Sequence, residues 1–104
     1  MLALVVRFDL PDPAATQAFD ALVREALPGI RSEEPGTLVY ATHTVEGEPL
    51  ARVFYEVYAD AEAFAAHEAA PHTRAMLDAF GPLLTGTPRV EHFPAVAGKG
   101  LPQG

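Results

Sequence analysis

The side chains of this chain that could do chemistry gather in its middle part. They are two histidines, His67 and His72, and the three tyrosines, Tyr40, Tyr55 and Tyr58. Imidazole exchanges a proton near neutral pH, and tyrosine offers a flat aromatic surface with a hydroxyl at its tip. Together these residue types suit proton transfer to or from a bound aromatic molecule.

His67 is the strongest candidate for a general base. It follows Phe64 by three positions in an expected helix, so both side chains share the inward side of that helix. His72, which comes directly after Pro71 at the start of the next helical piece, is the second candidate. The alternatives are a structural histidine at a helix end for His67, and a capping or solvent-facing role for His72. We predict that both histidines are catalytic.

Aromatic side chains are predicted to bind the substrate. The predicted set is Tyr40, Tyr55, Tyr58, Phe64 and Phe80. The tyrosines lie on neighbouring expected strands, and the phenylalanines lie on the inward sides of expected helices. The alternative is that the tyrosines simply pack, and that phenylalanine and methionine side chains fill the core.

Glu56 is a carboxylate inside a strongly apolar strand. A buried charge needs a polar partner, because its removal from water is costly. We expect a structural ion pair with Arg52, Arg7 or a strand neighbour; the alternative is solvation at a sheet edge.

Sequence motifs for metals, nucleotides and covalent catalysis are missing. The chain has no cysteine, and His43 and His92 lie on different expected strands without a close spacing such as His-x-x-x-His. It also lacks a phosphate loop, a dinucleotide fingerprint and the Gly-x-Ser-x-Gly motif, and its only serine is Ser32. We therefore predict no metal site, no cofactor and no serine hydrolase.

The elements that must position these residues follow the order β-α-β-β-α-β. Apolar periodicity and Gly and Pro residues predict strands at 2–9, 37–45, 50–58 and 89–93, and helical pieces at about 13–27, 61–68 and 72–80. Pro28-Gly29 is expected to break or kink the first helix, with room for a further turn through Ile30. The order predicts a ferredoxin-like α+β fold, in which helices cover one face of a four-stranded antiparallel sheet.

The other face of such a sheet is left bare. Its alternating apolar residues need a cover, and a second copy packed sheet to sheet with two-fold symmetry is the simplest one. The pattern therefore predicts a homodimer. We expect one domain over residues 1–94, followed by a tail, 95–104, that is flexible or bound by a partner.

Composition narrows the choice of partners. Hydrophobic residues make up 49% of the 104 residues, which is typical of a globular protein. The formal charge of −7 repels phosphate backbones and anionic membranes, so we expect neither nucleic acid nor membrane as a partner. The apolar start is too short for a signal peptide, and nothing approaches the ~20 apolar residues of a bilayer span, which favours a cytoplasmic location.

Three short motifs carry a resemblance to a known family. They are the Pro35-Gly36 turn before the second strand, the run Tyr55-Glu56-Val57-Tyr58 that ends the third, and His67 about one turn before Pro71-His72. With this order over residues 2–93, the chain resembles the antibiotic biosynthesis monooxygenase family.

The resemblance implies a dimeric α+β barrel with a pocket between helices and sheet. In related enzymes this pocket accepts a quinol or similar phenol, whose anion reacts with dioxygen without flavin or metal. The expected function is thus a cofactor-independent monooxygenase that acts on a small quinol or phenolic aromatic substrate with dioxygen.

The sequence also departs from the family pattern. It contains no Trp and no Asn, and Tyr58 stands where many relatives carry a Trp. Leu77 falls near the position of the axial His of the haem-degrading branch, which argues against haem degradation. Two other functions stay open: a non-catalytic small-ligand-binding or stress-response dimer, and an isomerase or decarboxylase on a related scaffold.

Overall fold

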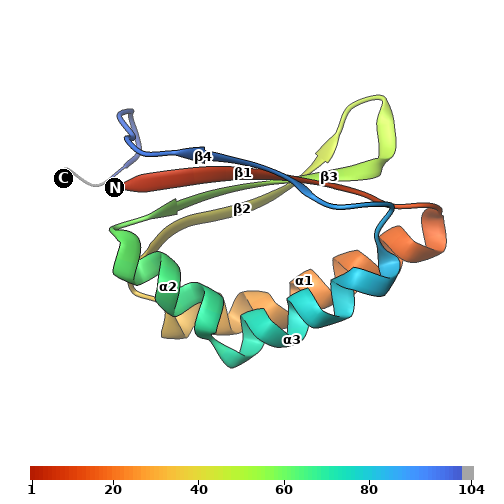
Figure 1. Ribbon diagram of the computed structural model, residues 1–104, viewed down its shortest axis with the longest axis horizontal. Helices are drawn as coiled ribbons and strands as arrows, with labels where there is room; N and C mark the ends of the chain where they lie inside the picture. The colour runs from red at the N-terminus through yellow and green to blue at the C-terminus, as the bar shows by residue number, and fades with distance from the viewer. Residues whose placement is uncertain (102–104) are drawn as a thin grey trace.

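A four-stranded antiparallel sheet carries all its helices on one face (Figure 1). The computed structural model describes residues 1–101. In chain order the elements are β1 (Leu2–Asp9), α1 (Pro13–Glu33), β2 (Thr37–Val45), β3 (Glu48–Tyr58), α2 (Ala61–Ala69), α3 (Pro71–Phe80), the short 3₁₀ helix η1 (Gly81–Leu83) and β4 (Arg89–Phe93). The strand order is β2-β3-β1-β4. This confirms the predicted ferredoxin-like α+β fold; in the single chain the sheet stays open, with β2 and β4 at its edges.

The alternation of apolar residues in β1 decides which face of the sheet is covered. Leu4, Val6 and Phe8 point to the helices and are buried, and β1 lies between β3 and β4 in the sheet. The first helix begins where Asp12 caps it: its carboxylate accepts a hydrogen bond of 2.8 Å from the backbone N–H of Ala15. Local sequence and burial therefore agree at the start of the fold.

Of the break or kink expected at Pro28-Gly29, the break is wrong, and the further turn through Ile30 is present. Helix α1 continues through Pro28 to Glu33, although the proline ring cannot donate a backbone hydrogen bond. Ile30, on the continued turn, is buried on the same side as Val23 and Ala26, and this burial outweighs the local cost of the proline. This continuation of α1 past Pro28 brings Glu34 to the end of the helix, in contact with His67 of α2 and His72 of α3.

Aromatic rings fill the part of the core next to the start of α1. Phe19 stacks on Phe80 with ring centroids 4.1 Å apart, and Phe8 and Phe54 pack around this pair. Phe80 is 1% exposed. Tyr40, Glu56 and His67, which the sequence analysis singled out, lie elsewhere in the same layer, near α2.

The face of the sheet opposite the helices carries no helix among the described residues (Figure 1). None of the helices in residues 1–101 combines the length and the apolar character that a bilayer crossing requires. Residues 95–101 of the predicted tail contain neither helix nor strand, and residues 102–104 lie outside the described part of the chain.

Candidate functional site

A cavity of about 250 Å³ lies between the sheet and helices α2 and α3. Its walls are largely apolar and include Val6, Phe64 and Met76. Polar side chains reach it from different elements: Tyr40 from β2, Glu56 from β3, His67 from α2 and Thr73 from α3. An apolar pocket with a few convergent polar groups is the usual form of a small-molecule site.

His67 lies in the last turn of α2 and is 4% exposed. Its Nδ1 is 2.6 Å from Oε1 of Glu34, and its Nε2 is 3.9 Å from Oε1 of Glu56. The rings of Tyr40 and Tyr58 lie next to it, with centroids 5.2 and 5.4 Å from the imidazole. The imidazole is therefore held at one nitrogen and lines the cavity between two carboxyl groups.

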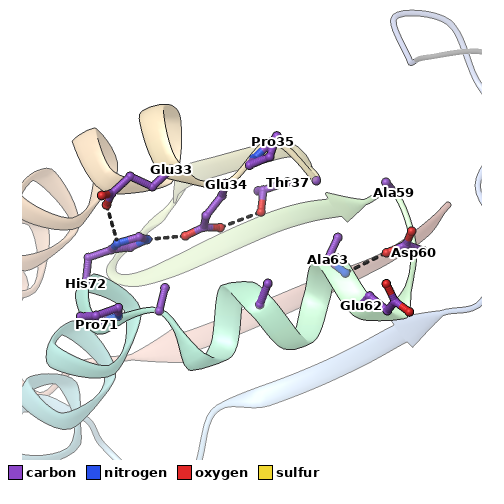
Figure 2. Close-up of a pocket in the computed structure, with 13 residues that line it drawn as sticks. Glu33, Glu34, Pro35, Thr37, Ala59, Asp60, Glu62, Ala63, Pro71 and His72 are labelled. Atoms are coloured by element: carbon purple, nitrogen blue, oxygen red, sulfur yellow. Dashed lines mark hydrogen bonds and ion pairs between the residues drawn. The ribbon is translucent and has the colours of Figure 1, made fainter.

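Glu34 is the centre of a buried hydrogen-bond network. Thr37 Oγ1 donates to its Oε1 at 2.6 Å, His67 contacts the same oxygen, and His72 Nε2 contacts Oε2. Figure 2 shows this carboxylate between His72 and Thr37. Burial raises the pKa of Glu34, but the hydrogen bonds from Thr37, His72 and His67 outweigh it and leave the pKa below its ordinary value.

An ionised Glu34 fixes the proton on His67. A carboxylate can only accept, so His67 Nδ1 must carry a hydrogen and donate it. In the neutral imidazole the lone pair then lies on Nε2, the nitrogen that faces Glu56. The arrangement prepares His67 to accept a proton at Nε2.

Two glycines make room for this network. A Cβ at Gly29, in α1, would lie 2.6 Å from Nδ1 of His72, and a Cβ at Gly36 would lie 2.4 Å from Cβ of Ala63 in α2. Both distances are too short for real contacts. Gly29 therefore admits the His72 ring, and Gly36 lets the turn after Glu34 approach α2.

Glu56 is 5% exposed and accepts a hydrogen bond from the hydroxyl of Tyr58 on the same strand. Burial raises its pKa, partly opposed by the Tyr58 hydrogen bond and by His67. Burial and the negative charge of Glu56 also raise the pKa of Tyr40 and of Tyr58 well above the ordinary value. The cavity thus contains a carboxyl group that holds its proton more tightly than usual.

The expected ion pair between Glu56 and an arginine is wrong. Arg52 pairs with Asp20 of α1 at 3.0 Å, and Arg7 pairs with Glu48 at 2.7 Å. Arg7 lies opposite Val53, so it points to the other face of the sheet, away from Glu56. The strand neighbour Tyr58 and the helix residue His67 face Glu56 instead.

The other predicted site residues are divided among different places. Tyr40, Phe64 and His67 line the cavity, and Tyr58 lies behind it, 0% exposed, bonded to Glu56. Tyr55 alternates with Phe54 and Glu56 along β3, so it points to the helix-free face. Phe80 belongs to the aromatic core and does not line the cavity.

His72 lies outside the cavity, in the wall of a second hollow of about 870 Å³ (Figure 2). Glu33, Glu34 and Asp60 line the same hollow. His72 therefore contacts the shared carboxylate from the outer side, whereas His67 contacts it from the cavity side.

Sequence reasoning missed Glu34 and Thr73. In the sequence Glu34 looks like half of an exposed acidic pair, and only the continuation of α1 past Pro28 carries it inward. Its place directly before the Pro-Gly turn is the one signal that points to it. Thr73 is 1% exposed and has no signal in the sequence beyond its place next to His72. Within residues 1–101 no group of three or more His, Cys, Asp or Glu side chains is arranged to hold a metal ion.

Comparisons with known proteins agree with this fold. The antibiotic biosynthesis monooxygenase family model matches residues 1–79. A Caulobacter crescentus protein, named after the same family, is 26% identical, with a TM-score of 0.84 over 92% of this chain and 90% of its own. A Mycobacterium tuberculosis protein is also 26% identical, with a TM-score of 0.83 over 94% of this chain and 97% of its own.

A Nitrosomonas europaea protein, 21% identical over 93% of this chain and 100% of its own, shares the fold with a TM-score of 0.83. A comparison with curated proteins gives no match. Since the family model covers most of the chain, the protein belongs to the antibiotic biosynthesis monooxygenase family.

Proposed function

We propose that this protein is a cofactor-independent monooxygenase that oxidises a small quinol or phenol with dioxygen. The observation that carries the proposal is the buried His67, which lines a largely apolar cavity and has Nδ1 held 2.6 Å from Glu34. Membership of the monooxygenase family supports the reaction type. The proposed substrate sits in the cavity, against Tyr40 and Phe64.

The first step is proton transfer from a substrate hydroxyl to Nε2 of His67. The imidazolium that forms is buried, and a buried cation is costly unless a negative charge lies beside it. Glu34, whose pKa is held below its ordinary value, supplies that charge at Nδ1. The base and its supporting carboxylate are thus positioned before the substrate arrives.

The second step is the reaction of the electron-rich anion with dioxygen. One oxygen atom forms a new C–O bond on the ring and the other leaves as water, so a quinol and dioxygen give a hydroxyquinone and water. The quinol supplies all four electrons. The apolar walls favour this outcome because they keep bulk water from the anion.

The cavity limits the size of the substrate. Its volume of about 250 Å³ lies below the roughly 300–1,000 Å³ of sites for drug-sized ligands, so one or two fused rings suit it best. Leu77 and Val90, which are 40% and 45% exposed, line the cavity where it meets the surface between α3 and β4. We assign the substrate's way in to this opening.

The working form is proposed to be a homodimer. Val5, Val39, Ala41 and Tyr55 lie on the helix-free face of the sheet and are only partly buried in the single chain. A second sheet packed on this face buries them and would complete the dimeric barrel.

A second candidate function is an isomerase that moves a proton within a small carbonyl compound. The observation that favours it is Glu56, a carboxyl group of raised pKa beside His67 in the same cavity. Such a pair can donate and accept protons at two atoms of one substrate. An isomerase needs no dioxygen, which separates it from a monooxygenase; a purely ligand-binding protein would bind the same compounds without turnover.

The experiment is oxygen uptake with a panel of mono- and bicyclic quinols, using protein treated with chelator and freed of flavin. We expect uptake above the protein-free autoxidation rate, and with ¹⁸O₂ one labelled atom in the product. Hydrogen peroxide as the stoichiometric product, or uptake equal to the protein-free rate, would contradict a monooxygenase. Conversion of a carbonyl substrate under anaerobic conditions would favour the isomerase.

A further inference from the structure

Thr73 carries a buried hydroxyl without a partner. The residue is 1% exposed, and among the described residues its Oγ1 has no hydrogen-bond partner. Buried hydroxyls are nearly always hydrogen-bonded, because a buried unpaired hydroxyl destabilises the fold. The unpaired hydroxyl of Thr73 therefore points to a hydrogen-bond partner that the described residues themselves do not supply.

The other buried threonine in a helix shows the ordinary arrangement. Thr16 in α1 is 6% exposed, and its Oγ1 donates to the backbone carbonyl of Pro13, one turn earlier, at 2.7 Å. Thr73 makes no bond of this kind, although it also lies in the first turn of a helix. The Thr73 hydroxyl is therefore available to hydrogen-bond a group outside its own helix.

Thr73 lines the same cavity as His67, Glu56 and Tyr40. A hydroxyl both donates and accepts, so its natural partner in an apolar cavity is an oxygen of a bound molecule. His67 serves the hydroxyl that loses its proton. Thr73, on a different helix, is free to meet a second oxygen.

We propose that Thr73 is a specificity-determining residue that hydrogen-bonds the second oxygen of a dioxygenated aromatic substrate. This inference rests on the proposed function of the cavity and narrows it. A diol satisfies both His67 and Thr73, because one hydroxyl donates to Nε2 of His67 and the other pairs with the Thr73 hydroxyl, whereas a monophenol of the same ring size leaves the Thr73 hydroxyl unpaired. The site therefore selects hydroquinones over simple phenols.

The test is calorimetric titration with 1,4-dihydroxynaphthalene and with 1-naphthol under anaerobic conditions, so that binding is measured without turnover. Thr73→Val keeps the shape of the side chain and removes its hydroxyl. We expect it to weaken the diol about tenfold, the effect of one hydrogen bond, and to change 1-naphthol by less than about twofold. Thr73→Ser should restore the diol affinity, and the matched control Thr16→Val should leave the ratio of the two affinities unchanged.

The melting temperature of the ligand-free protein is the second readout. Thr73→Val should not lower it, because no hydrogen bond within the protein is lost. Equal weakening of both ligands, an unchanged diol affinity, or a melting temperature well below that of Thr16→Val would overturn the role of Thr73. Failure of the wild-type protein to bind either ligand would overturn the proposed function itself, and this inference with it.

Discussion

Nδ1 of His67 lies 2.6 Å from Oε1 of Glu34, although the two residues are 33 positions apart in the chain. The contact joins the last turn of α2 to the end of α1 and is buried on both sides. Because His67 also lines the cavity, the contact connects a structural carboxylate to the group proposed to take the substrate proton.

Glu34→Gln should lower turnover about 10- to 100-fold, because it removes a charge-assisted hydrogen bond from the buried imidazole. An amide can present either an oxygen or an NH₂ group to Nδ1, so the orientation of His67 is no longer fixed. The measurement is kcat for oxygen uptake. Glu33→Gln is the matched control: its side chain is 71% exposed, and it should retain turnover close to that of the wild type.

Glu34→Gln should also change the response to acid. The folded-state pKa of Glu34 lies below the ordinary value of 4.5, so its stabilisation is complete above about 4.5 and is lost as the pH falls through the lowered value. Glutamine does not titrate, so the variant does not lose stability in this way. Chemical unfolding should show the wild type and the variant converging in stability as the pH falls below 4.5; a constant difference would contradict the assigned charge of Glu34.

Glu56→Gln should have the opposite pH dependence. Burial raises the folded-state pKa of Glu56, so the wild type loses stability as the pH rises from 4.5 through that raised value. Glutamine keeps an acceptor for the Tyr58 hydroxyl and carries no charge. The variant should gain stability relative to the wild type on going from acid to neutral pH, measured by thermal or urea unfolding. A variant that is less stable than the wild type by the same amount at every pH would contradict the raised pKa of Glu56 in the folded protein.

Gly29→Ala should destabilise the protein by about 1–3 kcal/mol, the usual cost of overpacking. The new Cβ would lie 2.6 Å from Nδ1 of His72, and the ring cannot move away without breaking its contact with Glu34. Helix propensity alone predicts the opposite, since Ala is about 1 kcal/mol better than Gly within a helix. Gly81→Ala is the control, because nothing lies within 4 Å of its added Cβ. Equal stability of Gly29→Ala and the wild type would contradict the packing of His72 on α1.

The helix-free face of the sheet should carry the dimer contact. Sedimentation should give twice the chain mass of 11.1 kDa. Tyr55→Glu places a charge in the centre of the proposed interface and should yield monomers, whereas the control Ala14→Glu, on the exposed side of α1, should remain dimeric. A stable wild-type monomer at micromolar concentration would contradict this part of the account.

The sequence allowed most of the fold to be predicted, because local signals agree with tertiary packing there. The alternation in β1, the Asp12 cap and the Pro-Gly turn each have one consistent structural meaning. The end of α1 did not follow from local rules, since the burial of Ile30 overrides the effect of Pro28.

The site was harder to predict than the fold, because its contacts depend on tertiary packing that overrides local sequence signals. Glu34 reaches His67 only because α1 runs past Pro28, and Tyr55 is excluded from the cavity by strand alternation. The unpaired state of Thr73 depends on how α3 sits over the sheet, which no short pattern encodes. His67, identified by its spacing from Phe64, is the predicted catalytic residue that contacts Glu34 from the cavity side.

The most direct test of the account is the turnover of His67→Ala and His67→Gln with an accepted quinol. Glutamine retains a hydrogen bond to Glu34 but has no titratable nitrogen, so a base predicts that both variants lose turnover by about 10² or more. Both should remain folded dimers. Full turnover in both variants would contradict proton transfer to His67, and rescue by Gln alone would assign His67 a positioning role instead.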